Sequence, residues 1–167
     1  MNNEPTISVV IFEDNAALRD SLALLLQNSS GIELKAVYAD ATRLQSRMEQ
    51  TLPDVVLMDI QMPGVNGIEA VQIIKEKFPG VQVMMQTVFD SDDKVFASLC
   101  AGASGYILKN TEPARVIQAI REVAGGGSFF TPSIAKKVLQ SFQQPANTGY
   151  VQLTAREKEV LQGLVDG

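Results

Sequence analysis

Five polar side chains stand directly after apolar runs that are typical of buried β-strands. Glu13 and Asp14 follow one such run, and Asp59 ends another. Thr87 and Lys109 hold the same position after two later runs. In a doubly wound parallel sheet, ligands bind outside the carboxyl ends of the strands, so we expect these side chains to converge. Crowded carboxylates repel one another, and a hard cation such as Mg²⁺ relieves that repulsion while leaving room for phosphate oxygens.

The other residue types narrow the chemistry that this group could perform. The 167-residue chain contains no histidine, which excludes Ser-His-Asp triads, histidine-ligated metals and a phosphohistidine on this chain. Cys100 lies in an apolar helical stretch and is interpreted as a core residue without a catalytic role. Taken alone, each polar residue could be a helix cap or a surface group, as we expect for the turn residue Asp54. The prediction therefore depends on their coincidence at successive strand ends.

The elements that must position these residues alternate along the chain. Short apolar runs favour strands, and apolar residues at helical spacing favour helices between them. Strands are predicted at 7–12, 33–38, 55–58, 81–85 and 105–108. Helices are predicted around 18–26, 42–50, 68–78, 92–101 and 116–123. This alternation indicates an α/β fold: a doubly wound, five-stranded parallel sheet of flavodoxin-like order 2-1-3-4-5, with helices on both faces.

A different organisation is expected after the fifth helix. Three glycines at 125–127 end that helix, and Pro132 begins an extra helix that runs to about Phe142. Residues 143–152 are predicted to be an exposed linker. Thr154 and Glu157 form a capping box that opens one more amphipathic helix. We therefore divide the chain into a domain at 1–127, an extra helix and linker at 128–152, and the start of an all-α domain at 153–167.

Charge and hydropathy exclude two kinds of partner. The net charge of −5 argues against extensive contact with nucleic acid, whose affinity depends largely on Lys and Arg. No apolar run approaches the roughly 20 residues that cross a bilayer, and no secretory signal is visible, so we expect no membrane contact and a cytoplasmic protein.

Three motifs in this order resemble the receiver domains of bacterial two-component response regulators. They are Val9-Val10-Ile11-Phe12-Glu13-Asp14, Val56-Leu57-Met58-Asp59-Ile60-Gln61-Met62-Pro63-Gly64 and Gly102-Ala103-Ser104-Gly105-Tyr106-Ile107-Leu108-Lys109. The resemblance covers about residues 6–125. As an ordered set these motifs are highly specific, although an acidic pair or a terminal lysine alone would be weak.

The resemblance implies a role for each residue of the group. Asp59 accepts a phosphoryl group from a phosphohistidine on a sensor histidine kinase, and Lys109 pairs with it. Thr87 donates its hydroxyl to the new phosphoryl group, and Tyr106 turns inward to fill the space that Thr87 leaves. The implied ligands of Mg²⁺ (or Mn²⁺) are the side chains of Glu13, Asp14 and Asp59 and the backbone carbonyl of Gln61. The resemblance also implies that phosphorylation reshapes the surface of the fourth helix, fifth strand and fifth helix, that it drives homodimer formation, and that the protein is not an enzyme.

The tail resembles the start of the LuxR-type helix-turn-helix domain of the NarL/FixJ subfamily. The matching residues are Leu153, Thr154, Arg156, Glu157, Glu159, Val160 and Leu161. This resemblance implies that the intact protein is a transcription factor whose recognition helix lies beyond Gly167. We accordingly expect that this fragment does not bind specific DNA sequences.

Two departures from the family pattern accompany the match. Asn110 follows Lys109 where many receivers have proline, although the NarL-like branch often lacks it. Val88 and Phe89 follow Thr87, whereas the family commonly has a small residue directly after this threonine. The larger side chains would narrow the path of an attacking water, so we hypothesise slow loss of the phosphoryl group.

Other functions fit the residues less well. A haloacid-dehalogenase-like phosphatase also forms an aspartyl phosphate, but its general acid is a second Asp at the position of Gln61. A flavodoxin-like cofactor site needs a glycine- or hydroxyl-rich loop after the first strand, where Glu13 and Asp14 would repel phosphate. A receiver that acts through protein contacts without phosphorylation stays an open alternative.

Overall fold

The computed structural model describes residues 4–88, 91–143 and 155–166. Its strands are β1 (Ile7–Phe12), β2 (Ile32–Tyr38), β3 (Val55–Asp59), β4 (Gln82–Thr87), β5 (Gly105–Leu108) and β6 (Phe129–Phe130). Its helices are α1 (Ala16–Gln27), α2 (Leu44–Thr51), α3 (Gly67–Lys77), α4 (Asp92–Cys100), α5 (Pro113–Ala124), α6 (Pro132–Gln143) and α7 (Ala155–Asp166). None of the helices in these ranges combines the length and apolar character that spanning a membrane requires.

The strands form one parallel sheet in the order β2-β1-β3-β4-β5-β6. This confirms the predicted α/β fold and the predicted order of its first five strands. The sixth strand was not predicted: Phe129 and Phe130 pair with Gly105 and Tyr106 at the β5 edge. Two residues are too few to show an alternating or continuous apolar pattern, so such a strand is recognisable only from its partner.

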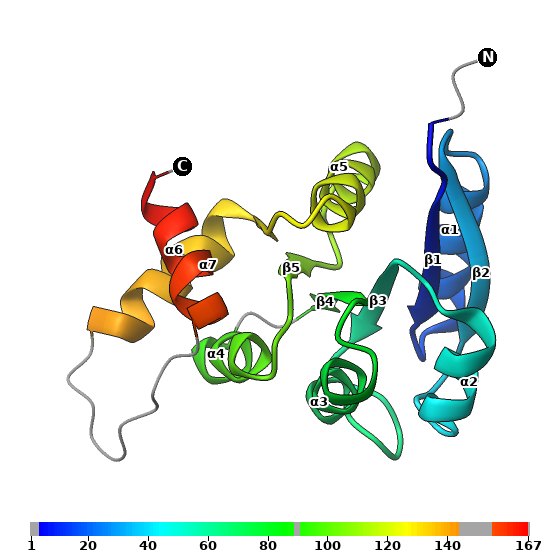
Figure 1. The fold of residues 1–167 in the computed structure, drawn as a ribbon, viewed down its shortest axis with the longest axis horizontal. Helices are drawn as coiled ribbons and strands as arrows, with labels where there is room; N and C mark the ends of the chain where they lie inside the picture. Colours follow the sequence, from blue (N-terminus) through cyan, green and yellow to red (C-terminus); the bar gives the residue numbers. More distant parts are fainter. Residues whose placement is uncertain (1–3, 89–90, 144–154, 167) are drawn as a thin grey trace.

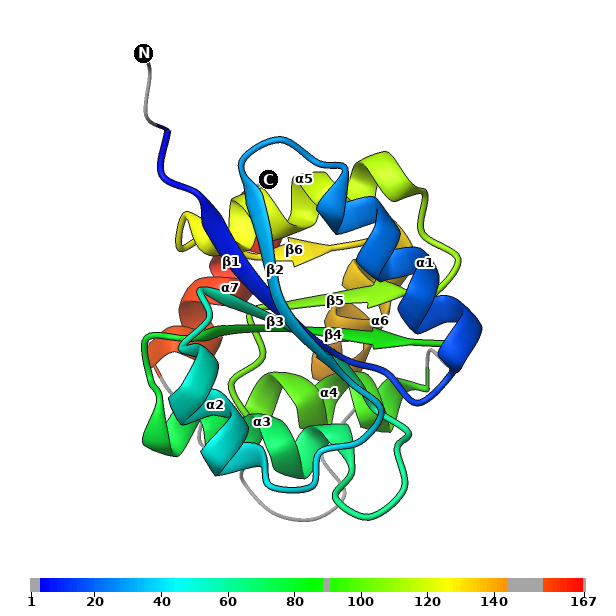
Figure 2. The same cartoon turned by 90° about the vertical axis from the view of Figure 1, so that its right-hand side faces the viewer.

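Helices cover both faces of the sheet (Figure 1; Figure 2). On one face α1 and α5 bury apolar residues of alternate strand positions, including Leu57 and Ile107. On the other face α2, α3, α4 and α6 cover the intervening positions, including Met58 and Tyr106. The central strands are buried on both faces, which explains why β1 and β3 have continuous apolar runs instead of alternating ones.

Local capping fixes where the helices beside the carboxyl edge begin. The side chain of Asn15 accepts a hydrogen bond from the backbone N–H of Leu18 (3.0 Å), and that of Asn66 accepts one from the N–H of Glu69 (3.0 Å). Each bond satisfies an amide that has no partner within the helix. Both helices therefore begin directly after the loops that carry the acidic residues.

The two C-terminal helices pack onto the same face of the sheet as α4. Ile134 and Val138 of α6 are buried in the core on that face, and Leu161 and Leu164 of α7 pack against it. Arg156 of α7 donates hydrogen bonds to Gln82 Oε1 (2.7 Å) and Ser104 Oγ (2.8 Å). Thr154 of the predicted capping box and residues 144–152 of the predicted linker lie outside the described residues.

A strained backbone position after α2 gives a prediction on stability. Leu52 has φ 41° and ψ 59°, and its side chain is 63% exposed. The left-handed region costs an L-residue with a Cβ roughly 1 kcal/mol, whereas glycine adopts it readily. We expect Leu52→Gly to raise the free energy of unfolding by up to about 1 kcal/mol in urea denaturation.

A second leucine supplies the matched control for this prediction. Leu24 is also 63% exposed but lies within α1, where its φ is not positive. Leu24→Gly should lower the free energy of unfolding by about 1 kcal/mol, because glycine is unfavourable inside a helix. A loss of stability in both variants would show that the conformation of Leu52 is not strained.

Candidate functional site

The five polar residues of the strand ends lie at one edge of the sheet. Glu13 and Asp14 directly follow β1, and Lys109 directly follows β5. Asp59 is the last residue of β3, and Thr87 is the last residue of β4. In the parallel register Asp59 pairs with Gln86, next to Thr87, so the ends of these strands lie at the same level. The sheet therefore presents the group at its carboxyl edge.

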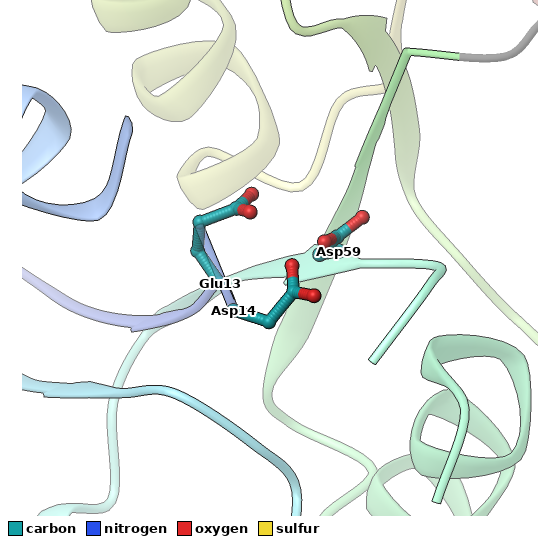
Figure 3. Close-up of side chains that lie close together, drawn as sticks. All are labelled: Glu13, Asp14 and Asp59. Carbon is teal, nitrogen blue, oxygen red and sulfur yellow. The ribbon is translucent and has the colours of Figure 1, made fainter. Parts of the chain in front are cut away.

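Three carboxylates face a common space at this edge (Figure 3). One oxygen each of Glu13, Asp14 and Asp59 lies within 4.8 Å of the others. Glu13 and Asp59 are only 1% and 2% exposed, whereas Asp14 is exposed to solvent. Two of the three charges are thus removed from water. Their mutual repulsion is poorly screened in the protein interior.

Lys109 lies between the two buried carboxylates. Its Nζ donates hydrogen bonds to Glu13 Oε1 at 2.8 Å and to Asp59 Oδ2 at 2.9 Å. With all groups ionised, three carboxylates and one ammonium leave a net charge of −2 on the cluster. The lysine therefore offsets part of the repulsion and leaves a site that still attracts a divalent cation.

The protonation of Asp59 reflects this crowding. Burial, together with the negative charge of Glu13, raises the pKa of Asp59 to about 7, although the hydrogen bond from Lys109 acts to lower it. Burial alone would lower the pKa of Lys109, but its bonds to Glu13 and Asp59 raise it above the ordinary value. The ammonium of Lys109 therefore stays charged near neutral pH, whereas the Asp59 carboxyl gains or loses its proton near that pH.

One buried atom indicates that the acidic cluster fits a metal ion. Glu13 Oε2 is buried, and within the described residues no hydrogen-bond donor reaches it. A buried carboxylate oxygen without a partner is costly, and a cation beside it removes that cost. Oxygen ligands that carry excess negative charge are those that Mg²⁺ prefers.

The other predicted site residues are Gln61, Thr87 and Tyr106, and all three lie on β-strands or loops at or near the carboxyl edge of the sheet. The backbone N–H of Gln61 is 3.3 Å from Asp59 Oδ1, so this peptide borders the cluster. Thr87 is 1% exposed, and its carbonyl accepts a hydrogen bond from the backbone N–H of Lys109 (2.8 Å). Tyr106 is fully buried on the face covered by α4 and α6.

Two residues that support Glu13 were not identified from the sequence. The backbone N–H of Asn15 donates to Glu13 Oε1 (3.0 Å), and Arg19 Nη1 donates to the carbonyl of Glu13 (2.9 Å). Arg19 lies on the first turn and a half of α1, where its side chain reaches back along the helix to the loop. These bonds hold the β1–α1 loop in the conformation that directs Glu13 inward.

Gly67 is a further residue that the sequence analysis missed. It is the first residue of α3, and its α-carbon packs against the backbone of Asp59. A Cβ at this position would lie 2.0 Å from the carbonyl oxygen of Asp59. The Asn66-Gly67 pair in the sequence was an available signal, because glycine is used where backbones approach closely.

Two of the three residues that depart from the family pattern are exposed. Val88 is 62% exposed, and Asn110 is also exposed. Phe89 lies outside the described residues. Asp54, expected to be a turn residue, lies at the opposite edge of the sheet and accepts hydrogen bonds from the backbone N–H and the hydroxyl of Ser8.

Known proteins resemble this chain over most of its length. Residues 9–121 match the family model of the response regulator receiver domain. The chain is 34% identical to the transcriptional regulatory protein YxjL of Bacillus subtilis over 170 residues, which span 99% of the chain and 78% of that protein. It is 32% identical to the transcriptional regulatory protein DegU of Brevibacillus brevis over 182 residues, which span 99% of the chain and 77% of that protein.

A solved structure shows the same fold. A two-component response regulator of the LuxR family from Aurantimonas sp. SI85-9A1 superposes with a TM-score of 0.77 and is 28% identical in sequence. The match covers 83% of this chain and 99% of that one.

Proposed function

The chain belongs to the response regulator receiver family, and on that premise we propose that Asp59 accepts a phosphoryl group from a phosphohistidine on a sensor histidine kinase. The observation that carries this proposal is the placement of Asp59. Its carboxylate is buried beside two further acids and lies 2.9 Å from the ammonium of Lys109. Phosphoryl transfer depends mainly on positioning and charge neutralisation, so such a group suffices without a histidine base.

We propose that Glu13, Asp14, Asp59 and the backbone carbonyl of Gln61 hold Mg²⁺ (or Mn²⁺). When bound, the cation would neutralise the carboxylates and the charge of the phosphoryl oxygens. The unpartnered Glu13 Oε2 supports this assignment, because it is the buried acceptor that a cation would satisfy.

Asp59, Lys109 and Thr87 have different roles in the proposed phosphoryl transfer. An oxygen of Asp59 attacks phosphorus while the bond from phosphorus to the donor breaks, and the electron pair of that bond leaves with the donor. Lys109 stays charged, as the raised pKa of its ammonium supports, and stabilises the new acyl phosphate. Thr87, at the adjacent strand end, donates its hydroxyl to a phosphoryl oxygen. The protein is itself modified in this step and is therefore not an enzyme acting on other molecules.

The response to phosphorylation is proposed to pass through Tyr106. Movement of Thr87 toward the phosphoryl group would empty a space that Tyr106 fills, which would shift an existing equilibrium between two conformations. Tyr106 is already buried beneath α4 and α6, so its movement would be transmitted to those helices. Homodimer formation and control of transcription by the intact protein are the proposed output, since relatives of this chain are transcriptional regulatory proteins.

Intact-protein mass spectrometry tests the proposed function. With Mg²⁺ and a phosphodonor, the protein should gain one phosphoryl group that hydroxylamine removes, as expected for an acyl phosphate. With Mg²⁺ and beryllofluoride, its oligomeric state should change. Asp59→Asn should abolish both results.

Asp20→Asn is the matched control for this experiment. Asp20 is an exposed residue of α1, and the same change of charge there should leave both results intact. An unmodified wild-type protein would contradict phosphorylation and favour a receiver that acts through protein contacts alone.

A further inference from the structure

A cavity of about 220 Å³ lies between α4, α6 and α7. Its walls are the last turns of α4, the turn that follows that helix, the end of α6 and the first turns of α7. It shares no lining residue with the acidic cluster. An engineered apolar cavity of about 150 Å³ in another protein stays dry and binds benzene, so this cavity has room for a slightly larger molecule.

The walls of the cavity are mainly apolar. Phe96 and Leu99 line it from α4, and Val160 and Leu161 line it from α7. The ring of Phe142 at the end of α6 packs edge to face on that of Phe96, with the ring centroids 5.7 Å apart. Aromatic rings favour edge-to-face or offset contacts with further rings. These two side chains therefore form an aromatic wall against which a flat ring can pack.

The charges at the cavity favour a neutral ligand. The charged residues of its lining are Arg156 and Glu157, whose charges are opposite. The guanidinium of Arg156 already donates hydrogen bonds to Gln82 and Ser104. Burial, with a smaller contribution from Glu157, raises the pKa of the Cys100 thiol, which is therefore uncharged at neutral pH. A charged ligand would lose its hydration in this cavity without gaining an opposite net charge.

We propose that this cavity binds a small uncharged aromatic molecule, between benzene and indole in size, and that the bound molecule holds α7 against α4. A helix of 12 residues such as α7 is marginal alone in water, so its contacts decide whether it stays packed. A ligand that contacts both helices binds only when α7 is packed, and it stabilises that arrangement by mass action.

The inference goes beyond phosphoryl transfer. It gives the chain a ligand-controlled contact between the receiver domain and the segment that resembles the start of a helix-turn-helix domain. The contact does not depend on phosphorylation of Asp59, so it can be tested on the unphosphorylated protein.

Indole fluorescence measures binding directly, because the chain contains no tryptophan. Addition of the 167-residue chain should shift the emission of indole to shorter wavelength, with saturable one-to-one binding and a Kd below about 1 mM. Benzene should displace the indole. Benzoate is similar in size but charged, and it should displace indole at least about tenfold less well than benzene does.

Ala101→Leu tests the location of the site. Ala101 lines the cavity, and its φ of −70° and ψ of −15° suit a larger residue equally well. The added carbons should occupy part of the cavity and weaken indole binding at least about tenfold. Ala17→Leu is the matched control, because it makes the same substitution at an exposed position of α1. This variant should bind indole within about twofold of the wild type.

Alkylation of Cys100 gives a second measurement on the wild type. Cys100 is the single cysteine of the chain, and it lines the cavity. Iodoacetamide alkylates its thiolate sulfur and releases iodide. The reagent must enter the cavity to react, so indole at ten times its Kd should slow the alkylation about tenfold. Alkylation of the chain unfolded in urea should be unaffected, which excludes a reaction of indole with the reagent.

The outcomes decide for or against the cavity as a ligand site. Indole that does not bind saturably would overturn the inference, as would equal affinities of the Ala101→Leu and Ala17→Leu variants. Alkylation of Cys100 at the same rate with and without bound indole would also overturn it. If circular dichroism shows that Ala101→Leu does not fold, the alkylation of the wild type decides alone. Phosphorylation of Asp59 is measured separately, so none of these failures would affect the proposed function.

Discussion

Gly67→Ala is expected to lower the free energy of unfolding by about 3 kcal/mol and to slow phosphorylation of Asp59 by about a hundredfold. The added Cβ would lie 2.0 Å from the carbonyl oxygen and 2.8 Å from the carbonyl carbon of Asp59. Neither contact is possible, and both partners are backbone atoms of a central strand that cannot turn away. The start of α3 and the end of β3 must therefore separate, which moves Asp59 away from Lys109 and the two neighbouring acids.

Urea denaturation and the rate of phosphorylation with Mg²⁺ would measure the two effects. Gly80→Ala supplies the control, because Gly80 is exposed, has no positive φ, and leaves open space around an added Cβ. That variant should keep wild-type stability and rate. If Gly67→Ala folds with wild-type stability and reacts at the wild-type rate, the close packing of α3 on Asp59 is wrong.

The position of the site was predictable because strand geometry determines it. A parallel sheet places the ends of all its strands at one edge, so residues that follow apolar runs meet whatever the details of the helices. Asp59 and Asp54 illustrate the rule, since two acids of the same short segment lie at opposite edges of the sheet. The distance of 2.9 Å between Lys109 and Asp59 follows from the same rule, although the two residues are 50 positions apart.

Features that depend on packing between distant elements were not predictable. Gly67 carries no chemistry of its own, and its role appears only when the backbone of β3 lies against it. Tyr106 is completely buried in a core that also contains Ile134 and Val138 of α6, a helix that was predicted without the surface on which it packs. Lys94 and Asp14 are separated by about half of the chain, and only the fold places both beside one hollow.

Binding of Mg²⁺ is expected to weaken about tenfold for each pH unit below 7 and to become nearly independent of pH above 7. Mg²⁺ binds the ionised carboxylate, whereas burial and the charge of Glu13 raise the pKa of Asp59 to about 7 in the metal-free protein. Below that pH a proton must leave Asp59 before the cation binds. Between pH 5 and pH 7 the apparent affinity should therefore rise about fiftyfold, with up to one proton released per cation.

Isothermal titration calorimetry in buffers of different ionisation enthalpy would measure both the affinity and the proton release. The change in the free energy of unfolding with pH gives an independent measure of the raised pKa of Asp59. Because the folded pKa of Asp59 lies above its unfolded value of about 3.9, the metal-free protein should lose stability as pH rises from about 4 to 7. Asp59→Asn should remove this loss and be more stable than the wild type at pH 8 without metal.

Saturating Mg²⁺ should reverse that dependence in the wild type, because a cation that binds only the folded, ionised site adds stability. Asp14→Asn separates the two contributions. Asp14 is exposed and makes a smaller contribution to the raised pKa of Asp59 than burial and Glu13 do, so its replacement should weaken Mg²⁺ binding and reduce the metal-free dependence on pH only slightly. An affinity for Mg²⁺ that is constant between pH 5 and pH 7 would mean that Asp59 is already ionised in the metal-free protein. Lys109 would then compensate its burial more completely than the geometry indicates.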